Sequence, residues 1–155
     1  MDLNHLGGKM KKILVSILAT CLLATGLSAN DIVGTWMTID DETGQAKSHI
    51  QIWIDNGVAY GKIIKLLNRK PGEDPDPICD KCTGADANKK VVGLVILRGL
   101  KQDGDEWKGG TIMDPKNGKV YKCKIKAENG GATLRVRGFI GFSLIGRTQI
   151  WKRLK

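Results

Sequence analysis

Short segments of alternating apolar and polar residues, separated by turn-forming residues, follow one another from Val33 to the C-terminus. The clearest segment covers residues 119–127, where Tyr121, Cys123 and Ile125 alternate with lysines. Successive side chains of a β-strand point to opposite faces, so such a segment has one buried side and one solvent-facing side. A chain built from these segments is expected to fold as antiparallel sheet.

The turns between the segments are rich in glycine, asparagine and aspartate. Asn56-Gly57 is the strongest hairpin signal, because both residues tolerate the positive φ of a type I′ turn. Eight strands in succession favour an all-β fold, an up-and-down antiparallel barrel that leaves no exposed edge. A two-sheet sandwich is the alternative. The expected strands cover residues 33–39, 47–55, 58–67, 91–100, 106–113, 119–127, 132–138 and 147–154.

The first 29 residues have the pattern of an export signal. The basic pair Lys11-Lys12 precedes an apolar run over residues 13–23, and small residues ending at Ala29 supply a cleavage site. The apolar run is too short to span a bilayer as a helix. We expect a signal peptide over residues 1–29, with Met10 as an alternative start, and one barrel domain over residues 30–155. The alternatives are a membrane anchor, a buried helix, or a lipoprotein processed at Cys21.

The chain is basic, with 25 lysines and arginines against 16 acidic residues and a formal charge of +9. This excess favours anionic partners, including an anionic envelope surface. No helix-turn-helix, zinc-finger spacing or RNA-stacking motif is present, so nucleic acid is not an expected partner. If two neighbouring strands pair, their outward side chains form a basic face, which consists of Lys122, Lys124, Lys126, Arg135 and Arg137. The alternative interpretation is that this face is an ordinary solvated wall of the barrel.

The sequence carries no Gly-x-Ser-x-Gly elbow, no phosphate loop and no His-Glu-x-x-His pair. His49 is the one histidine after the leader, and no neighbouring residue pattern suggests a catalytic triad around it. We therefore expect a protein that is not an enzyme and that uses no cofactor or metal.

Residues 68–90 lack periodicity and contain three prolines, several acids and the motif Cys79-Asp80-Lys81-Cys82. In an oxidising compartment, two cysteines this close are expected to form a small-loop disulfide. A redox motif needs a thiolate activated at a helix N-terminus, and a zinc site needs a second cysteine pair. A structural disulfide between Cys79 and Cys82 is thus favoured, and the loop is a candidate lid.

Gly34-Thr35-Trp36, on the first expected strand, resembles the Gly-x-Trp signature of lipocalins and the wider calycin group. In that group the tryptophan packs across the barrel base, beneath a basic side chain from the last strand. Arg147 and Arg153 are both candidates for this side chain, and the spacing does not choose between them. The barrel-closing set expected from the resemblance is Gly34, Trp36, Arg147 and Trp151.

A set of motifs in fixed order spans nearly all of the chain after the leader. The motifs are Gly34-Thr35-Trp36, Cys79-x-x-Cys82, Gly93-Leu94 with Gly99-Leu100, Trp107-Lys108-Gly109-Gly110, Asp114-Pro115-x-Asn117-Gly118-Lys119-x-Tyr121, Arg137-Gly138-Phe139-x-Gly141 and Gly146-Arg147-x-x-x-Trp151. The set resembles the bacterial domain-of-unknown-function family twenty-one forty-seven, small exported proteins similar to lipocalins. The resemblance implies a lipocalin-like barrel and export, and it implies no established activity.

The expected function is a non-enzymatic binding protein for a small lipophilic or amphipathic ligand, located in the periplasm or outside the cell. Apolar cavities bury most of such a ligand and orient it with a few polar groups. The alternatives are an envelope adaptor with a filled barrel, a membrane-surface protein and a Cys-x-x-Cys redox protein. The candidate ligand-binding residues are His49, Trp53, Tyr60, Trp107 and Tyr121.

Overall fold

The computed structural model of the protein describes residues 31–155. The expected signal peptide, including Met10 and Cys21, lies outside these residues. A short 3-10 helix, η1 (Gly84–Asp86), lies between the third and fourth strands. The strands are β1 (Gly34–Ile39), β2 (Ala46–Asp55), β3 (Val58–Leu66), β4 (Val95–Asp103), β5 (Glu106–Asp114), β6 (Lys119–Glu128), β7 (Thr133–Phe139) and β8 (Gly146–Arg153).

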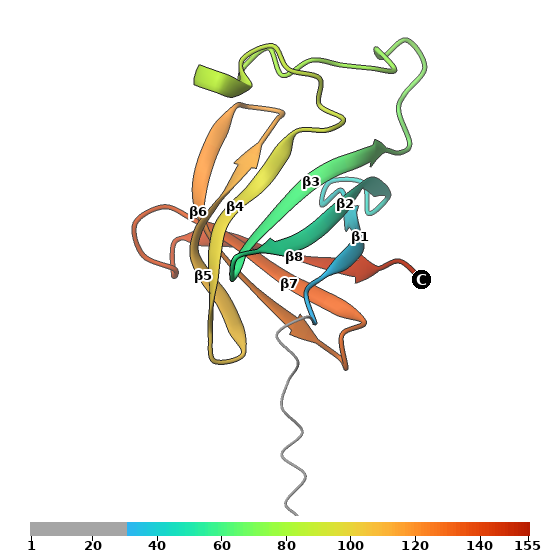
Figure 1. The fold of residues 1–155 in the computed structure, drawn as a ribbon. Coiled ribbons are helices and arrows are strands. Elements are labelled where there is room, and N and C mark those ends of the chain that lie inside the picture. The colour runs from blue at the N-terminus through green and yellow to red at the C-terminus, as the bar shows by residue number, and fades with distance from the viewer. Residues whose placement is uncertain (1–30) are drawn as a thin grey trace, which may run out of the picture.

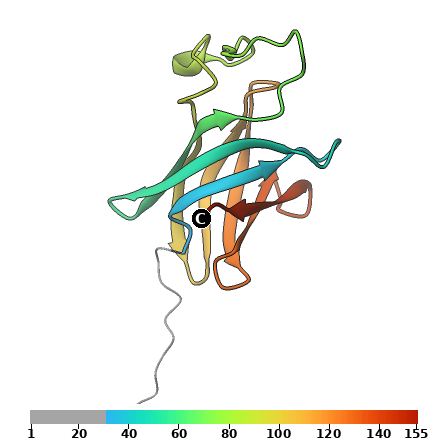
Figure 2. The same cartoon turned by 90° about the vertical axis from the view of Figure 1, so that its right-hand side faces the viewer.

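Each strand pairs antiparallel with the next, and β8 pairs with β1 to close the barrel. Figures 1 and 2 show the strands wrapping around one interior, with the β3–β4 loop standing at one end. Closure gives every strand two neighbours, so the backbone hydrogen-bonding groups of the sheet are paired on both sides. The predicted eight-stranded up-and-down barrel is confirmed, and the two-sheet sandwich is wrong.

β4 begins later than the sequence suggested. The chain bends through residues 91–94, where Gly93 adopts a φ of 98°. The bend is tied to β3 by two backbone hydrogen bonds: Gly93 N donates to Ile63 O at 2.7 Å, and Ile63 N donates to Leu94 O at 3.0 Å. The apolar run beginning at Val91 therefore starts in the loop and becomes a strand at Val95.

The interior of the barrel is filled with large apolar side chains. Inward-facing residues stand opposite one another across the strands, as Ile125 does to Trp107 and to Val136. Tyr121, Cys123 and Ile125, the side of β6 that was expected to be buried, face the barrel interior. The deepest side chains are at most 1% exposed, and they are Trp36, Ile50, Ile52, Leu97, Leu100, Ile125, Leu134 and Trp151.

Two inward-facing glycines show how tightly this interior is packed. A Cβ atom on Gly61 would lie 2.9 Å from Leu97 Cδ1 and 3.3 Å from Ile50 Cγ2. A Cβ atom on Gly138 would lie 3.3 Å from Ile112 Cγ2. These distances are tighter than ordinary van der Waals contact, so an added methyl group would require its neighbours to shift, as expected where packing approaches the density of organic crystals. The middle of the barrel is therefore a packed core.

Arg153 and Trp36 close one end of the barrel. Trp36 Nε1 donates a hydrogen bond to Ile32 O at 2.9 Å, and Arg153 Cζ lies 4.2 Å from the Trp36 ring centroid. A Cβ atom on Gly34 would lie only 2.7 Å from Arg153 Nη1, so the glycine makes room for this guanidinium. The guanidinium also donates to three backbone carbonyl oxygens, those of Asp31, Val33 and Gly131.

Arg147 is not part of this closure. It lies on β8 opposite Gly138, and its guanidinium forms an ion pair with Asp41 in the β1–β2 turn. Six residues of strand separate it from Arg153, a rise of about 20 Å. Arg153, and not Arg147, is therefore the basic side chain that lies over Trp36. The inclusion of Arg147 in the barrel-closing set is wrong. Trp151 is buried on β8 opposite Leu134.

Candidate functional site at the barrel mouth

The five residues expected to bind a ligand do not share one site. His49, Trp53 and Tyr60 lie on the outer wall of β2 and β3, because the three isoleucines that alternate with them on β2 face inward. The Trp53 and Tyr60 rings stack with centroids 5.7 Å apart, and Lys62 Nζ lies 5.8 Å from the Trp53 centroid. These three residues cannot line the barrel interior, so this part of the prediction is wrong.

Trp107 and Tyr121 do face inward, but at opposite ends of the barrel. Trp107 follows the β4–β5 turn directly, and its buried ring packs in the core opposite Ile125. Tyr121 lies near the start of β6 opposite Ile112, and it is only half-buried. Only Tyr121 of the five lies where a ligand could reach the interior.

The interior becomes accessible to solvent at the end where β3 leads into the long loop. Three inward-facing residues there, Leu66, Ile112 and Tyr121, are half-buried, whereas the inward-facing residues deeper in the barrel are almost fully buried. Ser48 pairs with Leu66, and a Cβ atom on Gly138 would meet Ile112 Cγ2 at 3.3 Å. We define the mouth by these three side chains. They come from β3, β5 and β6.

A chain of polar side chains enters the mouth from β8. Trp151 Nε1 donates to Gln149 Oε1 at 3.2 Å, and Gln149 Nε2 donates to Asp41 Oδ2 at 2.9 Å. Arg147 pairs with the same Asp41 carboxylate, and its side chain is 64% exposed. The rim on this side therefore offers a cation and an amide that are held in place by hydrogen bonds but remain open to solvent.

The β5–β6 turn also contributes a cation to the rim, and this cation reaches the β1–β2 turn. Lys116 Nζ lies 3.8 Å from Glu42 Oε1 in the β1–β2 turn, with both side chains largely exposed. Asn117 Nδ2 donates to the Tyr121 hydroxyl oxygen at 3.3 Å. Exposed ion pairs contribute little to stability, so both rim cations can exchange their carboxylate partners for an anionic group.

The buried polar side chains of the inner wall are already hydrogen-bonded to one another. Thr38 and Ser48 are buried on neighbouring strands, and their hydroxyl oxygens lie 2.7 Å apart, within hydrogen-bonding distance. Throughout residues 31–155, every buried side-chain nitrogen and oxygen atom has a hydrogen-bond partner. A polar ligand group would have to displace an existing bond to enter, so recognition is confined to the mouth.

The long loop is anchored to one wall by its cysteines. Cys79 and Cys82 form a disulfide, in agreement with the expected pairing, and both are buried. The Cys79 sulfur lies 3.5 Å from Pro115 O, and the Cys82 sulfur lies 3.5 Å from Met113 Sδ. Met113 points away from the barrel interior, so the disulfide covers an otherwise exposed apolar side chain. Figure 1 shows the loop above the β5–β6 turn.

A second contact fastens the loop at η1, where Asp86 pairs with Arg98 of β4 at 2.8 Å. The β5–β6 turn approaches the loop so closely that a Cβ atom on Gly118 would lie 1.8 Å from Lys81 O. These contacts lie on the β4–β5–β6 side of the barrel. The segment expected to act as a lid is thus fastened to that side of the barrel.

Cys123 is a free cysteine on the inner face of β6, opposite Gly110 and Gly138. Burial disfavours the charged thiolate and raises the pKa of the Cys123 thiol to about 12. A thiol in this state is a poor nucleophile and a poor metal ligand near neutral pH. Within residues 31–155, no three histidine, cysteine, aspartate or glutamate side chains converge as a metal site would require.

The basic face expected on β6 and β7 is largely neutralised by acidic partners. Three of its members pair with carboxylates: Lys124 with Glu106 at 3.3 Å, Lys126 with Asp105 at 2.5 Å and Arg135 with Glu128 at 2.8 Å. A hollow of about 470 Å³ lies over this wall and beneath the β7–β8 loop, outside the barrel.

No described helix has both the length and the apolar character needed to cross a bilayer.

The sequence matches a family model over residues 34–153, described as an uncharacterized protein conserved in bacteria, DUF2147. The chain belongs to this family. The resemblance drawn from the ordered motifs is therefore confirmed. A comparison with curated proteins gave no match.

Among solved structures, the chain is similar to protein HP1028 from Helicobacter pylori, described as belonging to the lipocalin family. The two share 21% identity with a TM-score of 0.67, over 79% of this chain and 82% of the other. The likeness shows that the DUF2147 barrel has a lipocalin-like fold. An eight-stranded barrel of this kind is filled by side chains or holds one small ligand, so the fold suggests a small-ligand-binding barrel.

Leu66, Ile112, Gln149 and Asp41 did not stand out in the sequence. The signal that could have found the first two is their position, as inward-facing residues close to a turn at the mouth end. Asp41 is a turn residue whose partners are more than one hundred positions away, so no local pattern in the sequence marks it.

Proposed function

We propose that the protein is an exported, non-enzymatic binding protein that holds a small amphipathic ligand shallowly at the mouth of its barrel. The observation that carries this proposal is the change in burial along the inner wall. Inward-facing side chains in the middle of the barrel are sealed, and Leu66, Ile112 and Tyr121 are half-buried at the mouth. Ile54 and Ala127 are half-buried at the other end, which Trp36 and Arg153 close. A ligand is therefore accommodated above the packed core, with much of its length outside the barrel.

The chemistry of the mouth selects the class of ligand. The aliphatic side chains of Leu66 and Ile112, with the Tyr121 ring, offer an apolar floor for part of an acyl chain. Arg147 and Lys116 offer cations at the rim, held by the neighbouring carboxylates of Asp41 and Glu42 in the β1–β2 turn. A molecule with an anionic head and a short apolar segment satisfies both, and guanidinium groups favour carboxylate and phosphate.

The envelope adaptor with a filled barrel is the competing function, and the packed core below the mouth gives it specific support. The two functions differ in whether a small molecule accompanies the protein. We expect native mass spectrometry of protein recovered from its own host, without delipidation, to detect a bound amphipathic molecule that organic extraction removes. A single unliganded mass, with thermal stability unchanged by extraction, would favour the adaptor.

Substitutions locate the ligand on the molecule. Leu66→Glu places a charge on the apolar floor, and we expect it to abolish co-purification of the bound molecule. Ile64→Glu is the matched control, because Ile64 lies on the same strand and its side chain is exposed. Loss of the bound molecule in both variants, or in neither, would contradict binding at the mouth.

A further inference from the structure

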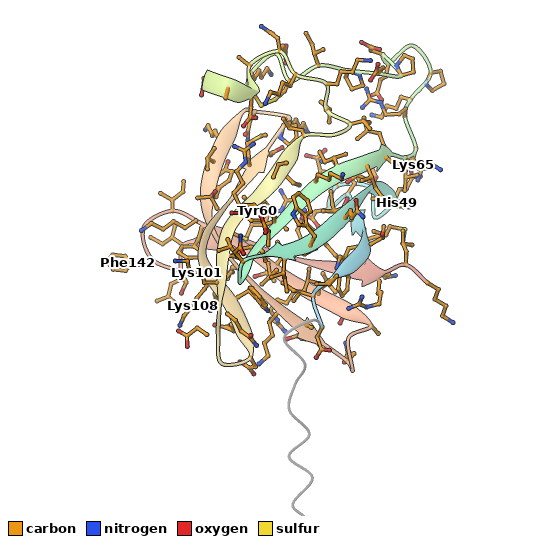
Figure 3. The ribbon with its side chains drawn as sticks, in the orientation of Figure 1. His49, Tyr60, Lys65, Lys101, Lys108 and Phe142 are labelled. Carbon is orange, nitrogen blue, oxygen red and sulfur yellow. A yellow bond between two sulfur atoms is a disulfide. The ribbon has the colours of Figure 1, made fainter. Side chains whose placement is uncertain are left out.

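The loop between β7 and β8 presents a cluster of apolar side chains to solvent. We call residues 140–145 the apolar loop. Its exposed side chains are Ile140, Phe142, Leu144 and Ile145, at 66%, 79%, 90% and 68% exposure. Figure 3 shows Phe142 projecting away from the barrel wall. Contiguous exposed apolar side chains on a soluble domain mark a surface that contacts a partner or a membrane.

The exposed conformation of the loop is held by hydrogen bonds to its own backbone. Arg137 Nε donates to Ser143 O at 2.6 Å, and Arg137 Nη2 donates to Leu144 O at 3.2 Å. Within the loop, Ile140 N donates to Ile145 O at 3.2 Å, and Ile145 N donates to Phe142 O at 3.0 Å. These bonds satisfy four of the loop carbonyls and the amides of Ile140 and Ile145, which lowers the penalty for entering a medium that lacks water.

Two cations without carboxylate partners flank the apolar loop. Lys122 Nζ lies 3.4 Å from Gly141 O, and Arg137 bonds to loop carbonyls and to the Thr148 hydroxyl at 2.8 Å. Within the part of the chain that the structure describes, neither forms an ion pair. The other three members of the same basic face are each paired with an acid. Unbalanced positive charge is thus concentrated beside the exposed apolar side chains.

We propose that the apolar loop docks the protein onto a bilayer that contains anionic phospholipid. The four exposed apolar side chains enter the boundary between head groups and acyl chains, and Lys122 and Arg137 lie at the level of the lipid phosphates. Proteins that bind membrane interfaces combine these two features, apolar insertion and basic side chains at the head groups. This inference stands apart from the ligand site at the mouth.

The arrangement of charge favours a bilayer over a second copy of the chain as the occupant of this surface. Two copies meeting through their apolar loops would bring the unpaired Lys122 and Arg137 of one molecule toward those of the other. Like charges brought together at an interface oppose association. An anionic lipid surface neutralises the same cations.

The test uses residues 30–155, which include all eight strands and the Trp36–Arg153 closure and exclude the apolar leader. We expect this domain to float with vesicles of phosphatidylcholine containing about 30% phosphatidylglycerol, and less with pure phosphatidylcholine. Phe142→Ser with Leu144→Ser should weaken the partition coefficient at least tenfold, on the order expected for removing two large apolar contacts. Lys122→Glu should weaken binding to the anionic vesicles alone. Ile64→Ser with Ile78→Ser, which changes exposed apolar residues elsewhere, should stay within about twofold.

A local readout separates insertion of the loop from other modes of attachment. The indole introduced by Phe142→Trp should shift its emission to shorter wavelength on the anionic vesicles, whereas the indole introduced by Ile64→Trp should not. The proposal is overturned if the wild-type domain fails to float, or if the Phe142/Leu144 double variant floats equally well. It is also overturned if sedimentation equilibrium shows a dimer that this double variant abolishes while vesicle binding is absent.

Discussion

Arg153 lies over the ring of Trp36, with its Cζ atom 4.2 Å from the ring centroid. The two residues face each other across the seam between the first and last strands, where Met37 also pairs with Lys152. The same guanidinium donates hydrogen bonds to Val33 O, just before β1, and to Gly131 O in the β6–β7 turn. Closure of this barrel thus depends on one side chain in addition to the strand ladder.

Replacing Arg153 by alanine should lower the free energy of unfolding by about 3 kcal/mol, the sum of a cation–π contact and several charge-assisted hydrogen bonds. Urea denaturation measures this change. Arg147→Ala is the control, since Arg147 makes an exposed ion pair, and its effect should stay below about 0.5 kcal/mol. Similar losses for the two variants would contradict the assignment of closure to Arg153.

Gly61→Ala should destabilise the protein by about 1–3 kcal/mol, because the added methyl group meets Leu97 and Ile50 in a filled interior. Thermal unfolding measures the change, and combining the substitution with Leu97→Val should recover part of the loss because the two sites couple. A neutral or stabilising Gly61→Ala would mean that the barrel contains a cavity where we find packed core.

Gly118→Ala should disturb the docking of the long loop. Gly118 and Gly130 have φ angles of 70° and 64°, so alanine at either position carries a similar backbone strain of about 1 kcal/mol. Only at Gly118 does the new methyl group also collide with Lys81 O, whereas no atom lies within 4 Å at Gly130. Limited proteolysis within residues 67–94 should accelerate in the Gly118 variant alone. Equal cleavage in both variants would contradict the docking.

Replacing both Cys79 and Cys82 by serine should lower the free energy of unfolding by about 2 kcal/mol, the value for a short closed loop. Removing the apolar sulfur contact above Met113 adds to this loss, since Met113 depends on the loop for its burial. Chemical denaturation with and without reductant measures the effect: reduction should destabilise the wild type and leave the variant unchanged. A reductant-insensitive wild type would contradict the presence of the disulfide.

Cys123 should make stability fall at high pH. Its thiol pKa is raised by burial from 9.0 to about 12, so between these values the unfolded chain releases a proton that the folded protein retains. The free energy of unfolding attributable to this group is intact below pH 9 and falls above it, by up to about 1.4 kcal/mol per pH unit. The stability difference between wild type and Cys123→Ala should therefore shrink as pH rises from 9 to 12. A constant difference would contradict the burial of the thiol.

Strand alternation predicted the fold because it depends only on local sequence. The inward residues of β2 and β6 are those that the alternation assigns to one face, and the turn at Asn56-Gly57 falls where its backbone preference requires. The start of β4 was missed because Val91 is buried in a loop, and an apolar run does not distinguish burial in a loop from burial in a strand.

The candidate site was harder to predict because it depends on contacts between distant segments. Aromatic character suggested Trp53 and Tyr60, yet alternation had already placed Trp53 on the face opposite the isoleucines, and the two rings stack outside the barrel. The choice between Arg147 and Arg153 required the register of β8 against β1. The polar rim depends on Asp41, whose partners come from the far end of the chain.

The most direct test of a shallow ligand site at the mouth is a titration followed by methyl NMR, using protein with labelled isoleucine and leucine methyl groups. With dodecyl phosphate below its micelle concentration as the probe, we predict that the methyl resonances of Leu66 and Ile112 shift in a saturable manner. Those of Ile50, Ile52 and Leu134 should remain unchanged, and Arg147→Glu should weaken the response. Shifts centred on the deep methyl groups, or no saturable shift at Leu66 and Ile112, would contradict the account.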